Sequence, residues 1–141
     1  MSLGGQLGPH DGTSLHERTI DNLVGSGKPG KAIVVAAGNE GDEHIHASGQ
    51  VPQGGTNEVS FQISSPTLVS IDVWYKGSDT FGIGFRDPTG TGLDPTPILP
   101  GGSNCYSGGG NLICIESRAN DPNSGDKEIF LLFFAATTGQ W

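Results

Sequence analysis

Apolar residues follow two different patterns along the chain, and the pattern changes between residues 49 and 55. Upstream, apolar side chains recur at helical spacing after Ser14, and Ser14–Glu17 has the S-x-x-E spacing of a capping box. We therefore expect a helix that is capped by Thr13 or Ser14 and is stopped by Gly25 and Gly27. The unbroken apolar run at residues 32–37 is typical of a strand buried on both faces, as in a parallel sheet.

Downstream, apolar and polar residues alternate with a period of two, which is the pattern of half-buried strands. The turn-forming sequence Asp87-Pro88-Thr89-Gly90 separates two of these runs. Short strands between clusters of Gly, Pro, Asn and Asp predict an antiparallel sandwich or barrel. The expected strands are 58–63, 69–75, 81–85, 112–115 and 129–136.

The two parts do not form one conventional domain. A piece of about 48 residues with one helix and one doubly buried strand cannot cover its own sheet. We interpret residues 1–49 as a fragment of a larger α/β domain, and residues 50–141 as a β-sandwich domain. Because the apolar faces of 1–49 would lack cover, we expect this part to form homo-oligomers, pack on a neighbouring chain or be poorly ordered.

Composition and charge narrow the set of partners. The 24 Gly and 9 Pro among 141 residues approach a low-complexity composition, but only 16% of the residues are charged, which argues against disorder. A net charge of −8 makes nucleic acid an improbable partner. No apolar stretch approaches the roughly 18 residues of a membrane helix, and no signal-peptide pattern follows Met1, so we expect no membrane partner.

The sequence Ala36-Ala37-Gly38-Asn39-Glu40-Gly41 after the apolar run resembles the subtilisin-like serine proteases, or subtilases. In that family A-A-G-N-E-G carries the Asn whose side-chain amide forms the oxyanion hole, so the resemblance assigns that role to Asn39. Ser2-Leu3-Gly4-Gly5 is similar to the strand that lines the family's substrate cleft. The resemblance covers roughly residues 2–49 and implies substrate contacts for Ser2, Leu3, Gly4, Ala37 and Gly38.

Residues 7–14 resemble a subgroup of subtilases that includes some spore-germination proteases. Those members carry a jelly-roll β-domain between the oxyanion Asn and the nucleophilic Ser. The resemblance therefore implies a mainly β chain, an inserted antiparallel jelly-roll-like sandwich preceded by a small α/β fragment. It also implies an extracellular, cell-surface or spore-associated location. Gly139-Gln140-Trp141 looks like the start of a further strand, so we expect the last strand to be incomplete.

The catalytic triad of the family is absent. Subtilases place Asp, His and Ser in that order along the chain, with Ser in a G-T-S-x-[SA] motif. Gly12-Thr13-Ser14 imitates this motif but precedes the Asn and is followed by Leu15-His16. A helix cap explains Ser14 better. We expect the parent protein to hydrolyse peptide bonds in peptide or protein substrates, and this chain alone to be inactive.

Other patterns are weaker and define the alternatives. His44-Ile45-His46 could offer two imidazoles, but zinc needs three or four ligands. Residues 121–126 begin like a calcium loop, although a hairpin turn is the better interpretation. We expect no cofactor and no metal, with calcium as the minor alternative. The rings of Trp74, Tyr75 and Trp141 suggest the second function class, a non-enzymatic interaction or carbohydrate-binding module.

The two cysteines are symmetric about Gly109-Gly110, a favoured pair for a two-residue hairpin turn. This register places Cys105 opposite Cys114. In a non-hydrogen-bonded site their Cα atoms would be about 4.5 Å apart, within the disulfide range. A disulfide requires an oxidising compartment, and two buried free thiols are the alternative.

Overall fold

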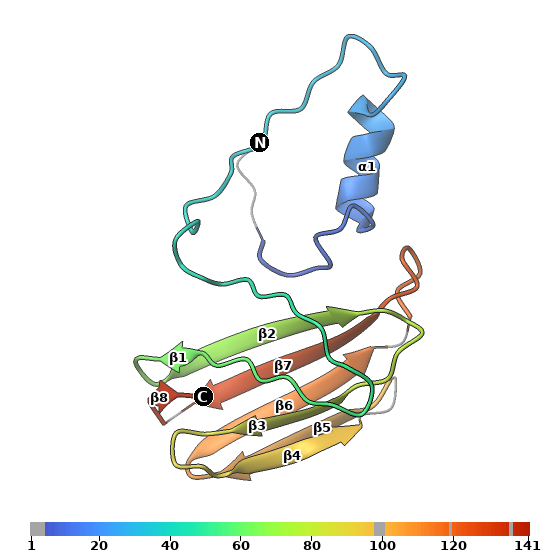
Figure 1. Cartoon of the computed structure of the whole chain (residues 1–141). Coiled ribbons are helices and arrows are strands. Elements are labelled where there is room, and N and C mark those ends of the chain that lie inside the picture. Colours follow the sequence, from blue (N-terminus) through green and yellow to red (C-terminus); the bar gives the residue numbers. More distant parts are fainter. Residues whose placement is uncertain (1–4, 98–100, 119, 136) are drawn as a thin grey trace.

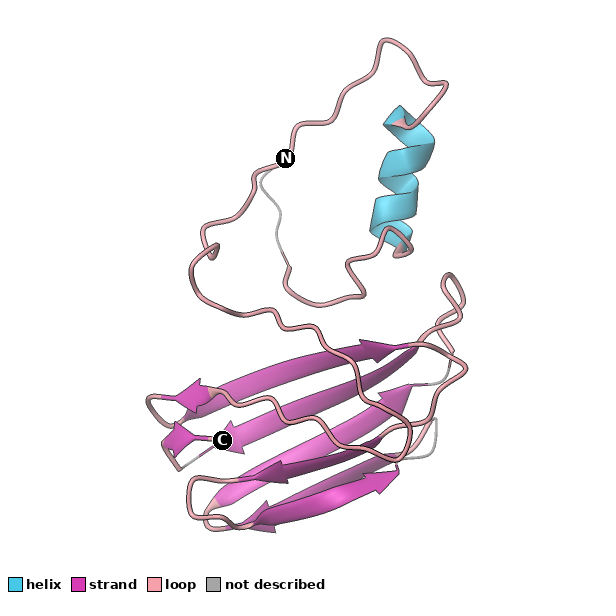
Figure 2. Ribbon diagram, viewed as in Figure 1, coloured by secondary structure: helices cyan, strands magenta, loops and turns pink. Residues whose placement is uncertain are grey.

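The computed structural model describes residues 5–97, 101–118, 120–135 and 137–141. This part of the chain contains one helix, α1 (Leu15–Val24), and eight strands, and all strand pairs are antiparallel (Figures 1 and 2). The fold is therefore mainly β with antiparallel sheets. The strands are β1 (Gln62–Ile63), β2 (Thr67–Tyr75), β3 (Gly82–Arg86), β4 (Gly92–Pro97), β5 (Ser103–Gly108), β6 (Asn111–Arg118), β7 (Lys127–Ala135) and β8 (Gly139–Gln140).

The first layer is a four-stranded sheet in the order β2-β7-β6-β5. Its period-two pattern sends one set of side chains to the core, as in the row formed by Val69, Phe133 and Ile113. The fully buried apolar residues of this face lie on the central strands β6 and β7: Ile113, Ile115, Ile129, Leu131, Phe133 and Ala135.

The second layer consists of two separate ribbons, β3–β4 and β1–β8. Each ribbon places aromatic rings against the side chain of Phe133. The ring centroids of Phe61, Trp141 and Phe85 lie 5.5, 5.6 and 6.3 Å from that of Phe133. The two ribbons therefore cover the apolar face of the four-stranded sheet, as in a sandwich.

Most strands of the second part agree with the sequence pattern. The runs 69–75, 81–85, 112–115 and 129–135 all lie in or adjoin observed strands, and a hydrogen bond from Gly90 N–H to the Asp87 carbonyl closes the expected turn. Residue 136 lies outside the described residues. The strand expected at 58–63 is shorter, because only β1 and a backbone pair between Phe61 and Trp141 form.

Strand β4 was not predicted, because Asp94, Pro95 and Pro97 interrupt any apolar alternation. Proline lacks a backbone N–H and is found in edge strands, where one side needs no partner. In the described residues β4 pairs only with β3, so it is such an edge.

The helix prediction is confirmed. Ser14 is the N-cap of α1, and the capping box is complete: Glu17 N–H donates to Ser14 Oγ at 3.3 Å, and Ser14 N–H donates to the Glu17 carboxylate at 3.1 Å. None of the α1 side chains is fully buried. No described helix has the length and apolar character that a membrane crossing requires.

The predicted buried strand at residues 32–37 is wrong. This segment is irregular, and Val34 and Val35 are 81% and 50% exposed. A strand is stable only when a neighbouring strand takes up its backbone hydrogen-bonding groups and its apolar faces are covered. The described part of the chain brings no strand beside this segment. The apolar run therefore has neither partner nor cover in this fold.

The hairpin register is confirmed. Gly109 and Gly110 both have positive φ, at 58° and 83°, as a two-residue turn of this kind requires. Strands β5 and β6 pair with Cys105 opposite Cys114, and a disulfide joins the two residues.

Candidate functional site

The A-A-G-N-E-G segment forms an exposed turn after the irregular apolar run. Gly38 has φ of +87°, a left-handed backbone conformation that favours glycine. Asn39 N–H donates to the Glu40 carboxylate at 3.0 Å. Ala37, Gly38 and Asn39 are all exposed.

The exposed position of Asn39 affects how well its side-chain amide could stabilise an oxyanion. A side-chain amide stabilises an oxyanion most when its neighbours hold it in position before the reaction. The side chain of Asn39 lies on an irregular, exposed segment, so packing does not hold it in one orientation. The described part of the chain therefore does not preorganise the Asn39 amide.

A shallow depression of about 390 Å³ lies beside the motif, between the N-terminal segment and residues 37–46. Gln6 and Ala37 both line it, so the chain near Gln6 comes close to the motif. Ser2, Leu3 and Gly4 themselves lie outside the described residues. The depression is lined by Gln6, Ala37, Glu40, Gly41, His44, Ile45 and His46.

The histidines near this depression do not lie on a strand. His44 has φ of +51°, which breaks the extended geometry expected for His44-Ile45-His46. The ring of His46 instead stacks on that of His10, with centroids 6.5 Å apart. In the part of the chain that the structure describes, no three His, Cys, Asp or Glu side chains gather closely enough to hold a metal ion.

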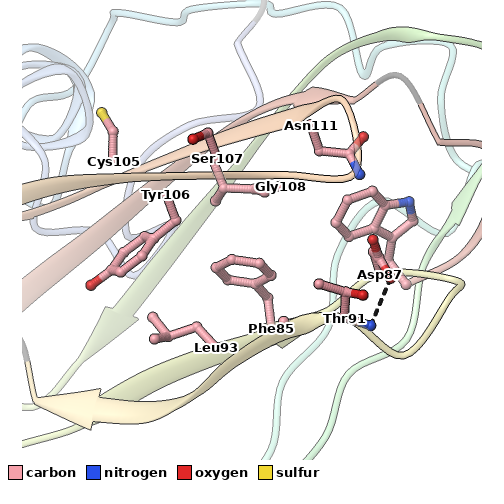
Figure 3. A pocket seen from close by; sticks show the side chains of 12 residues that line it. Phe85, Asp87, Thr91, Leu93, Cys105, Tyr106, Ser107, Gly108 and Asn111 are labelled. Atoms are coloured by element: carbon pink, nitrogen blue, oxygen red, sulfur yellow. Dashed lines mark hydrogen bonds between the residues drawn. The ribbon is translucent and has the colours of Figure 1, made fainter.

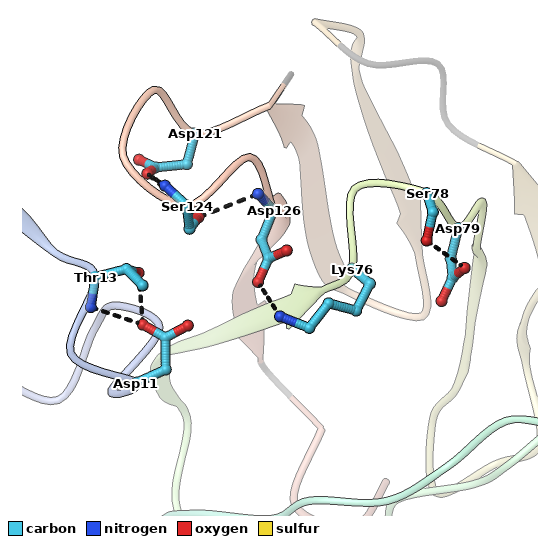
Figure 4. A network of polar contacts seen from close by, with 8 residues as sticks. All are labelled: Asp11, Thr13, Lys76, Ser78, Asp79, Asp121, Ser124 and Asp126. Atoms are coloured by element: carbon cyan, nitrogen blue, oxygen red, sulfur yellow. Dashed lines mark hydrogen bonds and ion pairs between the residues drawn. The ribbon is translucent and has the colours of Figure 1, made fainter.

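Ser14 and its neighbours serve the start of α1. The hydrogen bond with Ser14 lowers the pKa of Glu17, and the Thr13 hydroxyl lowers the pKa of Asp11 in the same way. Figure 4 shows Asp11 with its two bonds from Thr13. These contacts support Ser14 as a helix cap, as the sequence indicated.

The loop at residues 121–126 is a turn stabilised by its first residue. Asp121 Oδ1 accepts hydrogen bonds from the backbone N–H groups of Asn123 and Ser124 at 2.8 and 2.9 Å, and these bonds lower the Asp121 pKa. Asp126 forms an ion pair with Lys76 at 2.8 Å (Figure 4). The turn interpretation is confirmed, and both carboxylates have protein partners.

A cavity of about 360 Å³ opens between the β3–β4 ribbon and the β5–β6 hairpin. Phe85, Leu93 and Tyr106 point into it from opposite sides, whereas Cys105 points away (Figure 3). Sequence reasoning did not identify this cavity, because its walls come from strands of two different sheets that meet only in the folded chain. The lining residues are Phe85, Asp87, Thr91, Gly92, Leu93, Cys105, Tyr106, Ser107, Gly108, Asn111, Ile113 and Trp141.

The polar groups of this cavity hold neighbouring loops in place. Asp87 Oδ1 accepts from the backbone N–H groups of Thr89 and Thr91, both at 2.9 Å, and these bonds act with the Thr89 hydroxyl, the largest cause, to lower the Asp87 pKa. The Asn111 amide donates to Thr137 Oγ1 and accepts from Thr137 N–H, each at 2.9 Å. These hydrogen bonds therefore fix the loops that close this end of the sandwich.

The three rings considered for sugar binding do not share a face. Tyr75 and Trp141 belong to the core, and Trp74 points to the opposite face of the four-stranded sheet, beside Glu128 in the register. A stacking platform needs its rings on one accessible surface. The predicted carbohydrate-binding surface is therefore not assembled from Trp74, Tyr75 and Trp141.

Comparisons of the chain with family models, with curated proteins and with solved structures gave no match. The case for a function therefore depends on the residues and their geometry.

Proposed function

We propose that this chain is part of a subtilisin-like serine endopeptidase and supplies its oxyanion Asn, Asn39. The observation that carries the proposal is the motif Ala36–Gly41, placed after a helix and a six-residue apolar run. The exposure of that run supports the proposal. Val34 and Val35 would become buried if a larger α/β sheet accepted residues 32–37 as a strand.

In the proposed enzyme, Asn39 acts on the charge that develops during acyl transfer. A serine attacks the peptide carbonyl, and the negative charge on the oxygen is stabilised by the Asn39 side-chain N–H. The left-handed turn at Gly38 sets where the Asn39 side chain leaves the backbone. The Asp, His and Ser of the triad come from outside residues 1–141.

The first test is the activity of this chain alone on a chromogenic peptide. We expect no turnover, and serine-dependent turnover by the purified chain would contradict the expectation that this chain alone is inactive. The coding sequence around the chain provides the second test. Asp-Gly and His-Gly motifs upstream, with G-T-S-x-A downstream, would support the protease, and their absence would refute it.

The second candidate function is a non-enzymatic interaction module. It is favoured by a row of exposed apolar side chains across the outer face of the four-stranded sheet. Leu68, Phe134 and Leu112 are aligned on β2, β7 and β6, and they are 57%, 46% and 39% exposed. The same coding-sequence test distinguishes this module from the protease.

A further inference from the structure

The second layer of the sandwich contains a strip without a strand. In the described residues, β3 pairs only with β4 and β1 only with β8, whereas the opposite layer is a continuous sheet of four strands. Residues 57–60, which lead into β1, belong to no strand. One backbone edge of β3 and the backbone of residues 57–60 are therefore available for pairing.

Strand β8 enters this strip at one end. It runs antiparallel to β1, and Trp141 continues the ladder through two backbone hydrogen bonds with Phe61, at 2.9 and 3.1 Å. On its other side β8 lies against the turn after β3, since a Cβ on Gly139 would be 2.9 Å from the Pro88 ring. Figure 1 shows β1 and β3 running in the same direction and β8 in the opposite one.

Burial decreases along the strip as the distance from β8 grows. Ile63, Phe61 and Val59 have the same parity, so they would face the core from one extended strand. Ile63 is 2% exposed, Phe61 is half-buried and Val59 is 68% exposed. The apolar cover is therefore complete beside β8 and is lost where β8 stops.

Strand β2, at one edge of the four-stranded sheet, is also incompletely covered. On β2 the core-facing Val69, Ile71 and Val73 are only half-buried, although their partners on β7 are at most 4% exposed. Ile83 and Phe85 on β3 are also half-buried. A further strand beside β3 would reduce the contact of Ile83 and Phe85 with water.

We propose that this strip is a strand-acceptor groove, bounded by residues 57–60 and β3. Its occupant is an extended segment that continues β8 directly after Trp141 and pairs antiparallel with both edges. The β1–β8 register places the second position after Trp141 opposite Val59 and makes its side chain core-facing. The second layer then becomes one four-stranded sheet in the order β1-β8-β3-β4. This inference does not depend on the proposed protease function.

The register makes the groove testable with two fusions of identical composition. One adds six residues after Trp141 with valine at the second, fourth and sixth positions and threonine at the others. The control exchanges valine and threonine, which turns the valines to solvent. Hydrogen exchange of the amides at 57–60 and 82–86 is measured in both fusions and in the unmodified chain, together with the sedimentation coefficient.

We expect the first fusion to remain a monomer and to slow exchange at both segments by at least about tenfold, with the control close to the unmodified chain. Equal protection in both fusions, or protection in neither, would overturn the proposal. Protection that appears only with dimerisation would also overturn it, because the tail would then occupy a second copy instead of continuing its own β8.

Discussion

Cys105 and Cys114 lie directly opposite each other on β5 and β6, with their Cα atoms 4.0 Å apart and their sulfur atoms bonded. The relationship follows from the turn, because a two-residue Gly109-Gly110 turn fixes every pair along the hairpin. The cysteines alternate with the core-facing Tyr106 and Ile113, and Cys105 points away from the cavity (Figure 3), so the disulfide ties the edge strand β5 to β6 on the outer face of the sheet.

Breaking this disulfide should weaken the sandwich moderately. A closed loop of ten residues stabilises the folded state by at most roughly 3 kcal/mol. We expect the double variant Cys105→Ser/Cys114→Ser to lose up to that amount in urea unfolding, and reductant to shift the unmodified chain equally. Reductant should leave the double variant unchanged. An unmodified chain that is insensitive to reductant would refute the stabilising role.

Removing the helix cap should act locally. Substitution Ser14→Ala deletes the acceptor for Glu17 N–H, and losses of an N-cap are worth about 0.5–2 kcal/mol. Because α1 buries no residue, we expect faster hydrogen exchange within 15–24 and no change in the unfolding of the sandwich. The exposed Ser26 gives the control, Ser26→Ala. A loss of sandwich stability in Ser14→Ala would show that α1 is coupled to the sheet.

Glu128 should make the stability of the sandwich depend on pH. The carboxyl is 7% exposed, and burial, with the nearby Asp72 carboxylate, raises its pKa despite an ion pair with Arg118 at 3.0 Å. A raised pKa in the folded state favours the neutral acid. The associated stability is present below the ordinary glutamate pKa of about 4.3 and is lost as pH rises through the folded value.

Substitution Glu128→Gln removes this ionisation. We therefore expect the free energy of urea unfolding of the variant, relative to that of the unmodified chain, to increase from pH 4 to pH 7. Glu116→Gln is the matched control, because Glu116 also contacts Arg118 but is exposed. A stability difference that is independent of pH would contradict the raised pKa.

Asp87 should show the opposite dependence on pH. Its hydrogen bonds from Thr89 and Thr91 lower its pKa, so its contribution is present above the ordinary aspartate pKa of about 3.9 and is lost as pH falls through the folded value. We expect Asp87→Ala to lower the thermal midpoint at pH 7 and to have a smaller effect at pH 3. Asp79→Ala, which changes an exposed residue in a different turn, should have little effect at either pH. An equal loss at both pH values would exclude the charged turn as the cause.

The elements that were predicted correctly depend on residues close together in the sequence, whereas the others depend on distant residues. The capping box and the Gly109-Gly110 register depend on residues within a few positions of each other, and both were predicted correctly. The apolar run 32–37 needs strands that are distant in sequence, and its pattern could not reveal whether they are present. Strand β4 forms because the edge of β3 accepts it, a feature that its own prolines conceal.

The same distinction between local and distant determinants applies to the candidate site. The motif around Asn39 led to the proposed oxyanion role through its resemblance alone, and the exposed segment that carries it does not fix the orientation of the amide. The cavity beside Asp87 and Asn111 is the reverse case, because the folded structure shows it and no sequence motif predicts it. Its residues carry no catalytic motif, and only the assembled strands bring them together.

The most direct test of the account is the turnover number of the full-length protein encoded by the gene, with and without Asn39→Ala. We expect kcat on a peptide substrate to fall by about 100–1,000-fold, the range known for loss of an oxyanion-hole donor in subtilisin, with KM nearly unchanged. The control Asn22→Ala changes an exposed residue of α1 and should leave kcat as it was. An unchanged kcat in Asn39→Ala, or equal losses in both variants, would contradict the oxyanion role.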